Sequence, residues 1–152
     1  VDRLPRGGTF EVAAVVRIKQ HWHINANPAS PDFLIPTTLK ITSDLPLKVE
    51  KITYPKGEPL EFPEIEEPLK VYTRRVIVRA KVTLSEKVAQ KKGTLLLEIG
   101  YQACDDQRCL APSKLKVKLP VEVAPAGAVV KQINAKLFST EEKKDKPDDA
   151  PL

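Results

Sequence analysis

Apolar and polar residues alternate along most of this 152-residue chain. Between residues 10 and 19 every second side chain is apolar, and the intervening ones include glutamate, arginine and lysine. A period of two is typical of a β-strand with one buried and one solvated face. The alternation recurs in residues 38–42, 70–84, 95–103 and 115–123. The pattern therefore predicts strands along most of the chain and no long helix.

Two segments interrupt the alternation. Leu47 and Val49 share one phase, whereas Ile52 and Tyr54 have the opposite one, which predicts a bulge or bend between two short strands. Residues 55–68 contain four prolines and one glycine, so we expect a long irregular loop, and loops of this length are often functional. Seven or eight short strands with proline-rich turns predict an all-β fold, an immunoglobulin-like antiparallel β-sandwich.

The predicted strands end near residue 125, which suggests three parts. Residues 1–125 are expected to form the sandwich domain, and residues 126–138 a short C-terminal extension. Residues 139–152 are charged and lack apolar anchors, so we expect a disordered linker. A short helix is expected within the extension because three apolar residues lie four apart, at Val129, Ile133 and Leu137. The chain has no methionine, even at position 1, so we expect a processed or excised piece.

Composition narrows the class of protein. Hydrophobic residues make up 41% and charged residues 30%, which is a globular balance, and 14 prolines argue against a helical bundle. No apolar run approaches the ~18 residues of a membrane-spanning helix. The net charge of +5 divides into +7 for residues 1–138 and −2 for residues 139–152. Lys114, Lys116 and Lys118 alternate with apolar residues, which is typical of a solvated strand face rather than a nucleic-acid site.

The strongest candidate for chemistry is the pair Cys104 and Cys109, at the junction of two predicted strands. A tight connection can bring their Cα atoms within the ~4.4–6.8 Å of a disulfide. A bond over so short a loop stabilises little, so a redox and a structural role both stay open. Arg108 favours the thiolate of Cys109, whereas Asp105 and Asp106 oppose that of Cys104. In an exchange reaction, Cys109 is expected to attack and Cys104 to resolve.

Two other groups of polar residues are weaker candidates. On a strand, His21 and His23 would lie on one face, and with the two cysteines they could form a zinc site. The alternative is that His23 is a satisfied polar group at a strand end. Glu64, Glu66 and Glu67 could serve acid–base chemistry, but no histidine frames them, so a solvated loop is expected. Motifs of hydrolases and nucleotide-binding enzymes are missing from the sequence.

Three stretches resemble one known family, the periplasmic amino-terminal domain of the DsbD thiol:disulfide interchange proteins. They are residues 21–28 (HWHINANP) with 33–39, residues 54–57 (YPKG), and residues 101–112 (YQACDDQRCLAP). Together they span about residues 8–125. The resemblance implies an immunoglobulin-like sandwich in the periplasm, as one domain of an inner-membrane protein.

The resemblance also implies a reaction, that of a protein-disulfide reductase working by thiol–disulfide exchange without a cofactor. Electrons would come from a membrane-embedded cysteine pair of the same protein. They would pass to thioredoxin-like partners such as a disulfide isomerase or a cytochrome c maturation factor. By position, Cys104 and Cys109 are the redox pair, Cys109 forms the mixed disulfide, and Tyr101 and Arg108 lie nearby. We expect a monomer without bound metal or nucleic acid.

In the family, a cap loop covers the cysteine pair until a partner docks. Glu66, Glu67, Pro68 and Leu69 match its position, but the aromatic shield is absent and Pro68 or Leu69 replaces it. The tail from Ser139 would be the tether to the membrane domain. The alternative function is an immunoglobulin-like binding module whose disulfide is purely structural.

Overall fold

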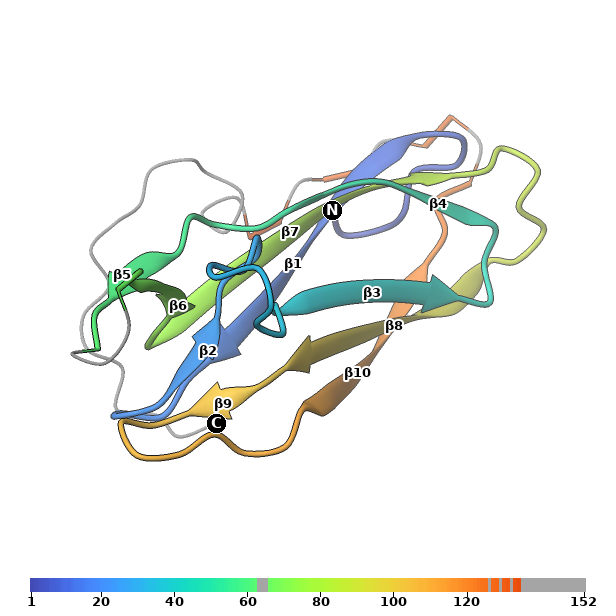
Figure 1. Ribbon diagram of the computed structural model, residues 1–152. Coiled ribbons are helices and arrows are strands. Elements are labelled where there is room, and N and C mark those ends of the chain that lie inside the picture. The colour runs from blue at the N-terminus through green and yellow to red at the C-terminus, as the bar shows by residue number, and fades with distance from the viewer. Residues whose placement is uncertain (63–65, 126, 129, 132, 135–152) are drawn as a thin grey trace.

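The computed structural model describes residues 1–62, 66–125, 127, 128, 130, 131, 133 and 134. These residues form ten strands and no helix (Figure 1). None of them belongs to a helix that is long and apolar enough to cross a membrane. The strands are β1 Thr9–Arg17, β2 His23–Asn25, β3 Thr38–Ser43, β4 Leu47–Thr53, β5 Glu58–Leu60, β6 Leu69–Tyr72, β7 Arg75–Leu84, β8 Lys92–Tyr101, β9 Ala103–Cys104 and β10 Ser113–Glu122.

Two three-stranded antiparallel sheets form the body of the molecule. One has the strand order β1-β7-β4 and the other the order β10-β8-β3. Figure 1 shows them as two layers, and the side chains between the layers form one hydrophobic cluster. Strands β1, β3, β7 and β8 contribute every second residue to this cluster because side chains alternate between the two faces of a sheet, whereas β10 contributes only Val121. The fold is an immunoglobulin-like antiparallel β-sandwich, which confirms the sequence prediction.

The core is centred on β7 and β8, the middle strands of the two sheets. Val78, Val82 and Leu84 on β7 are 0% exposed, and Leu95 on β8 is 1% exposed. Burial of one such side chain contributes about 1.5–3 kcal/mol. These most buried side chains therefore lie on the central strands of the two sandwich sheets.

A third sheet, with the order β5-β6-β2-β9, carries the cysteines. It forms because the predicted single strand over residues 70–84 is in fact two strands. β6 ends at Tyr72, and β7 begins at Arg75 after a turn in which Arg74 has a φ of 65°. This left-handed residue redirects the chain from the third sheet into the sandwich. The prediction of one continuous strand was therefore wrong.

Two predicted irregularities have different outcomes. The register of β4 on β7 shifts between Val49 and Lys51, which confirms the bulge, although it lies within one strand. The proline-rich loop over residues 55–68 was predicted too long, because β5 lies inside it and pairs with β6. Pro59 is tolerated there because β5 is an edge strand, which needs no ladder hydrogen bond on its open side.

Strand β10 also differs from the prediction. Its apolar face was expected to be buried, yet Leu115, Val117 and Leu119 are 40%, 58% and 41% exposed. They lie opposite the buried apolar residues of β8, so they point to the core side of the sheet. β10 is an edge strand, and no described element covers this side of it. Periodicity reveals which residues share a face, but not whether another layer lies over them.

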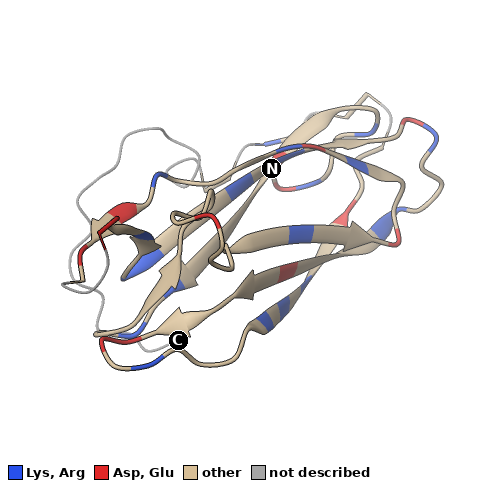
Figure 2. Cartoon of the chain, viewed as in Figure 1, with Lys and Arg blue, Asp and Glu red and all other residues tan. Residues whose placement is uncertain are grey.

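Strand β10 also carries lysines (Figure 2), which alternate with its apolar residues and therefore lie on the opposite face. Lys114 Nζ and Lys116 Nζ each lie 3.9 Å from a carboxylate oxygen of Glu98 on β8. Both lysine side chains are more than half exposed. This arrangement is the solvated strand face that the alternation predicts.

The C-terminal predictions lie mostly outside the described residues. Residues 139–152, the expected linker, lie wholly outside them, as do 126, 129, 132 and 135–138 of the expected extension. The other six residues of 126–138 are not helical. Near the end of the sandwich, Leu4 forms a parallel bridge with Val123, and the Asp2 N–H donates to the Lys131 carbonyl at 2.8 Å. The first residues of the chain thus pack beside its last strand.

Candidate redox site

Cys104 and Cys109 face each other across a tight hairpin that begins with β9. The Asp105 N–H donates to the Arg108 carbonyl at 2.9 Å, and the N–H after Cys109 donates to the carbonyl before Cys104, also at 2.9 Å. These bonds make the cysteines a non-hydrogen-bonded pair, the arrangement in which facing side chains lie closest. Their Cα atoms are 4.0 Å apart and their sulfurs form a disulfide. The backbone therefore holds the two sulfurs together independently of the bond between them.

Asp105 organises the turn between the cysteines. Its Oδ1 accepts hydrogen bonds from the N–H groups of Gln107 at 2.9 Å and Arg108 at 2.7 Å, as in an Asx turn. These backbone bonds, first that from Gln107, hold the pKa of Asp105 below its usual value. Arg108 Nε lies 3.9 Å from Asp105 Oδ2. The positive charge predicted to act on Cys109 is thus partly offset by Asp105.

The two sulfur-bearing residues differ in access to solvent. Cys104 is 5% exposed, because it lies within the third sheet as the last residue of β9. Cys109 is exposed, because it lies on the outer arm of the hairpin. An incoming thiol therefore reaches the residue Cys109 more readily than Cys104.

His23 is the cross-strand neighbour of Cys104. The antiparallel register of β2 on β9 pairs His23 with Cys104 and Ile24 with Ala103. His23 is 6% exposed, and burial lowers its pKa, although the charge of Asp105 opposes this effect. The imidazole is thus held in its neutral form beside the disulfide.

His21 does not share this position. β2 begins at His23, whereas His21 is exposed and has a φ of 70°, so the prediction that both imidazoles lie on one strand face was wrong. Within the described ranges, no three His, Cys, Asp or Glu residues gather as a metal site. The two cysteines are joined to each other, so they do not offer thiolate ligands.

The four residues predicted to shield the disulfide follow one another: Glu66, Glu67, Pro68 and Leu69. Ser30 Oγ donates to Glu67 Oε1 at 3.0 Å, which ties this segment to the chain that follows β2. Leu69 is the first residue of β6, and the register of β6 on β2 places it four positions away from the row of Cys104, roughly 13 Å along the sheet. The register does not bring Leu69 to the disulfide, and shielding stays a prediction. Glu64 lies outside the described residues.

An apolar groove of about 550 Å³ lies beside the hairpin. It runs between the end of β1 and the start of β10, and its walls include Ile18, Trp22, Tyr101, Leu110 and Leu115. Tyr101 was predicted to lie near the pair. Sequence patterns did not predict that Trp22 and Leu110 line this groove, although Trp22 is the single tryptophan of the chain and Leu110 directly follows Cys109.

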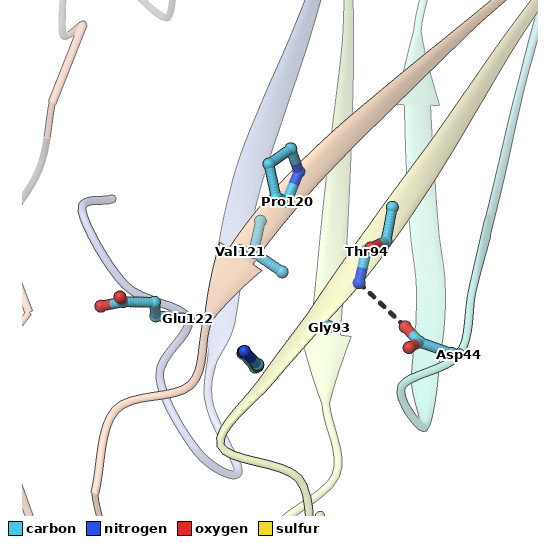
Figure 3. A pocket seen from close by; sticks show the side chains of 7 residues that line it. Asp44, Gly93, Thr94, Pro120, Val121 and Glu122 are labelled. Atoms are coloured by element: carbon cyan, nitrogen blue, oxygen red, sulfur yellow. Dashed lines mark hydrogen bonds between the residues drawn. The ribbon is translucent and has the colours of Figure 1, made fainter.

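A second hollow, of about 510 Å³, lies at the other end of the sandwich (Figure 3). It is roughly 30 Å from the hairpin along β8. The Thr94 N–H donates to Asp44 Oδ1 at 2.9 Å on its wall. No cysteine or histidine lines it, so it offers no group for redox chemistry. Its lining residues are Asp44, Lys92, Gly93, Thr94, Pro120, Val121 and Glu122.

Fold and site together define an immunoglobulin-like domain with a surface disulfide whose two cysteines differ in exposure. Residues 3–136 match the family described as "Thiol:disulfide interchange protein DsbD, N-terminal", and the chain belongs to that family. The reduced DsbD N-terminal domain of Neisseria meningitidis is a similar solved structure, with 18% identity and a TM-score of 0.45. That similarity covers 72% of this chain and 76% of the other. No curated protein is a significant match.

Proposed function

We propose that this chain is a periplasmic electron-relay domain, a protein-disulfide reductase that acts through Cys104 and Cys109. Membership of the DsbD N-terminal family supports thiol–disulfide exchange as the reaction. The observation that carries the proposal is the hairpin disulfide itself, with Cys109 exposed and Cys104 buried. A purely structural disulfide needs no accessible cysteine, whereas thiol–disulfide exchange requires one.

The reaction runs in two exchange steps from the reduced pair. The Cys109 thiolate attacks a disulfide of a thioredoxin-like partner, which forms a mixed disulfide and releases one partner sulfur as a thiolate. Cys104 then attacks the Cys109 sulfur, which closes the internal disulfide and releases the second partner sulfur. The partner gains two electrons and the domain loses two. A membrane-embedded cysteine pair of the same protein reverses these steps and restores the dithiol.

The remaining parts of the chain have roles in the same proposal. Residues 1–125 are the exchange domain, and residues 139–152 tether it, after the extension 126–138, to a membrane domain. Glu66 to Leu69 belong to the cap loop. The partners are periplasmic thioredoxin-fold proteins, including a disulfide isomerase and a cytochrome c maturation factor, and the domain acts as a monomer.

Trapping with single-cysteine variants tests the roles of the two cysteines. Cys104→Ala leaves the exposed Cys109 without its resolving partner, so it should accumulate a mixed disulfide with an oxidised thioredoxin-fold isomerase. Cys109→Ala is the matched control, and its buried Cys104 should accumulate none. Non-reducing gels and mass spectrometry measure the adduct. Absence of an adduct with both variants would contradict exchange.

The reduction potential separates exchange from the alternative of a binding module with a structural disulfide. Redox equilibrium with glutathione or dithiothreitol, followed by thiol trapping, gives the value for the intact chain. Structural disulfides typically lie below about −300 mV. We expect a higher value, and a potential well below that limit would favour the binding module.

A further inference from the structure

Three residues form one cross-strand row at the edge of the third sheet. His23 on β2 is paired with Cys104 on β9, and Cys104 is bridged to Cys109 across the hairpin. Directly paired residues of antiparallel strands project from the same face, with Cβ atoms ~4.5–5.5 Å apart. The His23 imidazole therefore lies on the same face as the disulfide, on the side of Cys104 away from Cys109.

We propose that the His23 imidazole accepts the proton of the Cys104 thiol when this thiol closes the disulfide. The inference rests on the proposed exchange function and adds a proton acceptor to it. Cys104 needs one because it is 5% exposed, and burial disfavours the charged thiolate that must attack. Cys109 is exposed and can lose its proton to water.

The proton and electron balance of this step is complete. In the mixed disulfide, Cys104 carries a proton and Cys109 is bonded to the partner sulfur. The proton moves to His23, the Cys104 sulfur bonds to the Cys109 sulfur, and the bond to the partner breaks with its electron pair on the partner sulfur. That sulfur takes a proton from the imidazolium or from water. In the reverse direction, the imidazolium protonates Cys104 as it leaves.

The surroundings of His23 suit a proton acceptor. Burial lowers its pKa, so the imidazole is neutral and free to take a proton at neutral pH. The carboxylate of Asp105 follows Cys104 and stabilises the imidazolium once it forms, while Arg108 is turned toward this carboxylate. On β6, continuation of the register places the uncharged Thr73 opposite His23. His23 makes no side-chain hydrogen bond to another residue of the described ranges that would occupy its nitrogens.

Stopped-flow reaction of the reduced chain with dithiobis(nitrobenzoate) separates the two steps. Attack by Cys109 releases a first coloured thiolate in a bimolecular phase. Closure by Cys104 releases a second in a phase that is independent of reagent concentration. We expect His23→Gln to leave the first phase within twofold and to slow the second by roughly 100-fold at neutral pH, the lower end of general-base effects. His21→Asn is the matched control, since it removes the exposed imidazole of the same motif, and both phases should stay unchanged.

The pH profile of the second phase provides a readout that needs no variant. With His23 as proton acceptor, the wild-type rate should rise with pH and level off below the ordinary histidine pKa of about 6.5. Without it, the rate should rise tenfold per pH unit at least up to the ordinary thiol pKa of about 8.5, because burial of Cys104 disfavours its thiolate, and the same profile is expected for His23→Gln. Added imidazole should speed closure in His23→Ala.

The role of His23 and the exchange function are overturned by different results. A wild-type rate that climbs to about pH 8.5, or a folded His23→Gln with closure within threefold of wild type, would overturn the role of His23 while leaving exchange intact. Absence of any second phase in the wild type would instead contradict the exchange function. Circular dichroism of the oxidised variants tests whether they are folded. If they are not, the pH profile of the second phase in the wild type alone tests the role of His23.

Discussion

Reduction of the Cys104–Cys109 disulfide is expected to lower the free energy of unfolding by only about 2 kcal/mol. The cysteines are five positions apart, so the bond closes a short loop. The loop-entropy relation gives about 2 kcal/mol for such a loop, against about 4.7 kcal/mol for one of 100 residues. The buried side chains of β7 and β8 belong to other strands, so the reduced chain should stay folded.

Urea denaturation of the oxidised and reduced chain measures this difference. The fluorescence of Trp22, which lines the groove beside the hairpin, and far-UV circular dichroism should report one transition in both states. For a chain of this size, 1 kcal/mol shifts the Tm by about 2–4 °C, so reduction should lower it by about 4–8 °C. The double variant Cys104→Ala/Cys109→Ala, without reductant, controls for effects of the reductant itself.

A much larger loss of stability would refute the reasoning. If reduction removed more than about 4 kcal/mol, or unfolded the chain, the bond would be constraining more than its own short loop. The hairpin would then depend on the disulfide, despite the backbone hydrogen bonds on both sides of the pair. A redox cycle would unfold part of the site at every turnover, which argues against an electron relay.

Three further perturbations test the fold around the site. Leu95→Ala should cost about 2–5 kcal/mol in urea denaturation because Leu95 is 1% exposed, whereas Val117→Ala, at 58% exposed, should change stability by less than about 0.5 kcal/mol. Gly57→Ala should lower the free energy of unfolding by about 1–3 kcal/mol, and the Tm with it, since the new Cβ would lie 2.5 Å from that of Ala26. Because burial lowers the pKa of His23, stability should fall as the pH drops from about 6.5 toward the folded pKa, and a pH series of His23→Gln should lack this dependence.

Much of the sandwich could be predicted from local pattern. β1, β7 and β8 largely alternate buried residues with less buried ones because each has one face on the core. The bulge in β4 was visible as a change of phase. The boundary between β6 and β7 was not recognised, because Arg74 is a single break in the apolar phase of Tyr72 and Val76, and such a break does not reveal the left-handed backbone that separates the two strands.

The site was predictable in part for a related reason. The cysteine pair is local, and the motif around it is specific. The pairing of His23 with Cys104 joins residues that are far apart in the chain, and no local periodicity encodes such a contact. The uncovered face of β10 is likewise a property of the layer opposite it, since Val117 has the same alternation as a core residue.

The separation of the disulfide from the core also bears on its reduction potential. By linkage, any stability that the disulfide gives to the fold appears as a lower potential in the folded than in the unfolded chain. About 2 kcal/mol of stabilisation corresponds to about 40 mV for a two-electron couple. A disulfide that closed a long loop through the core would have a still lower potential, closer to that of structural disulfides that resist reduction. By confining the pair to a hairpin at the edge of the third sheet, the fold limits this contribution to that of a short loop.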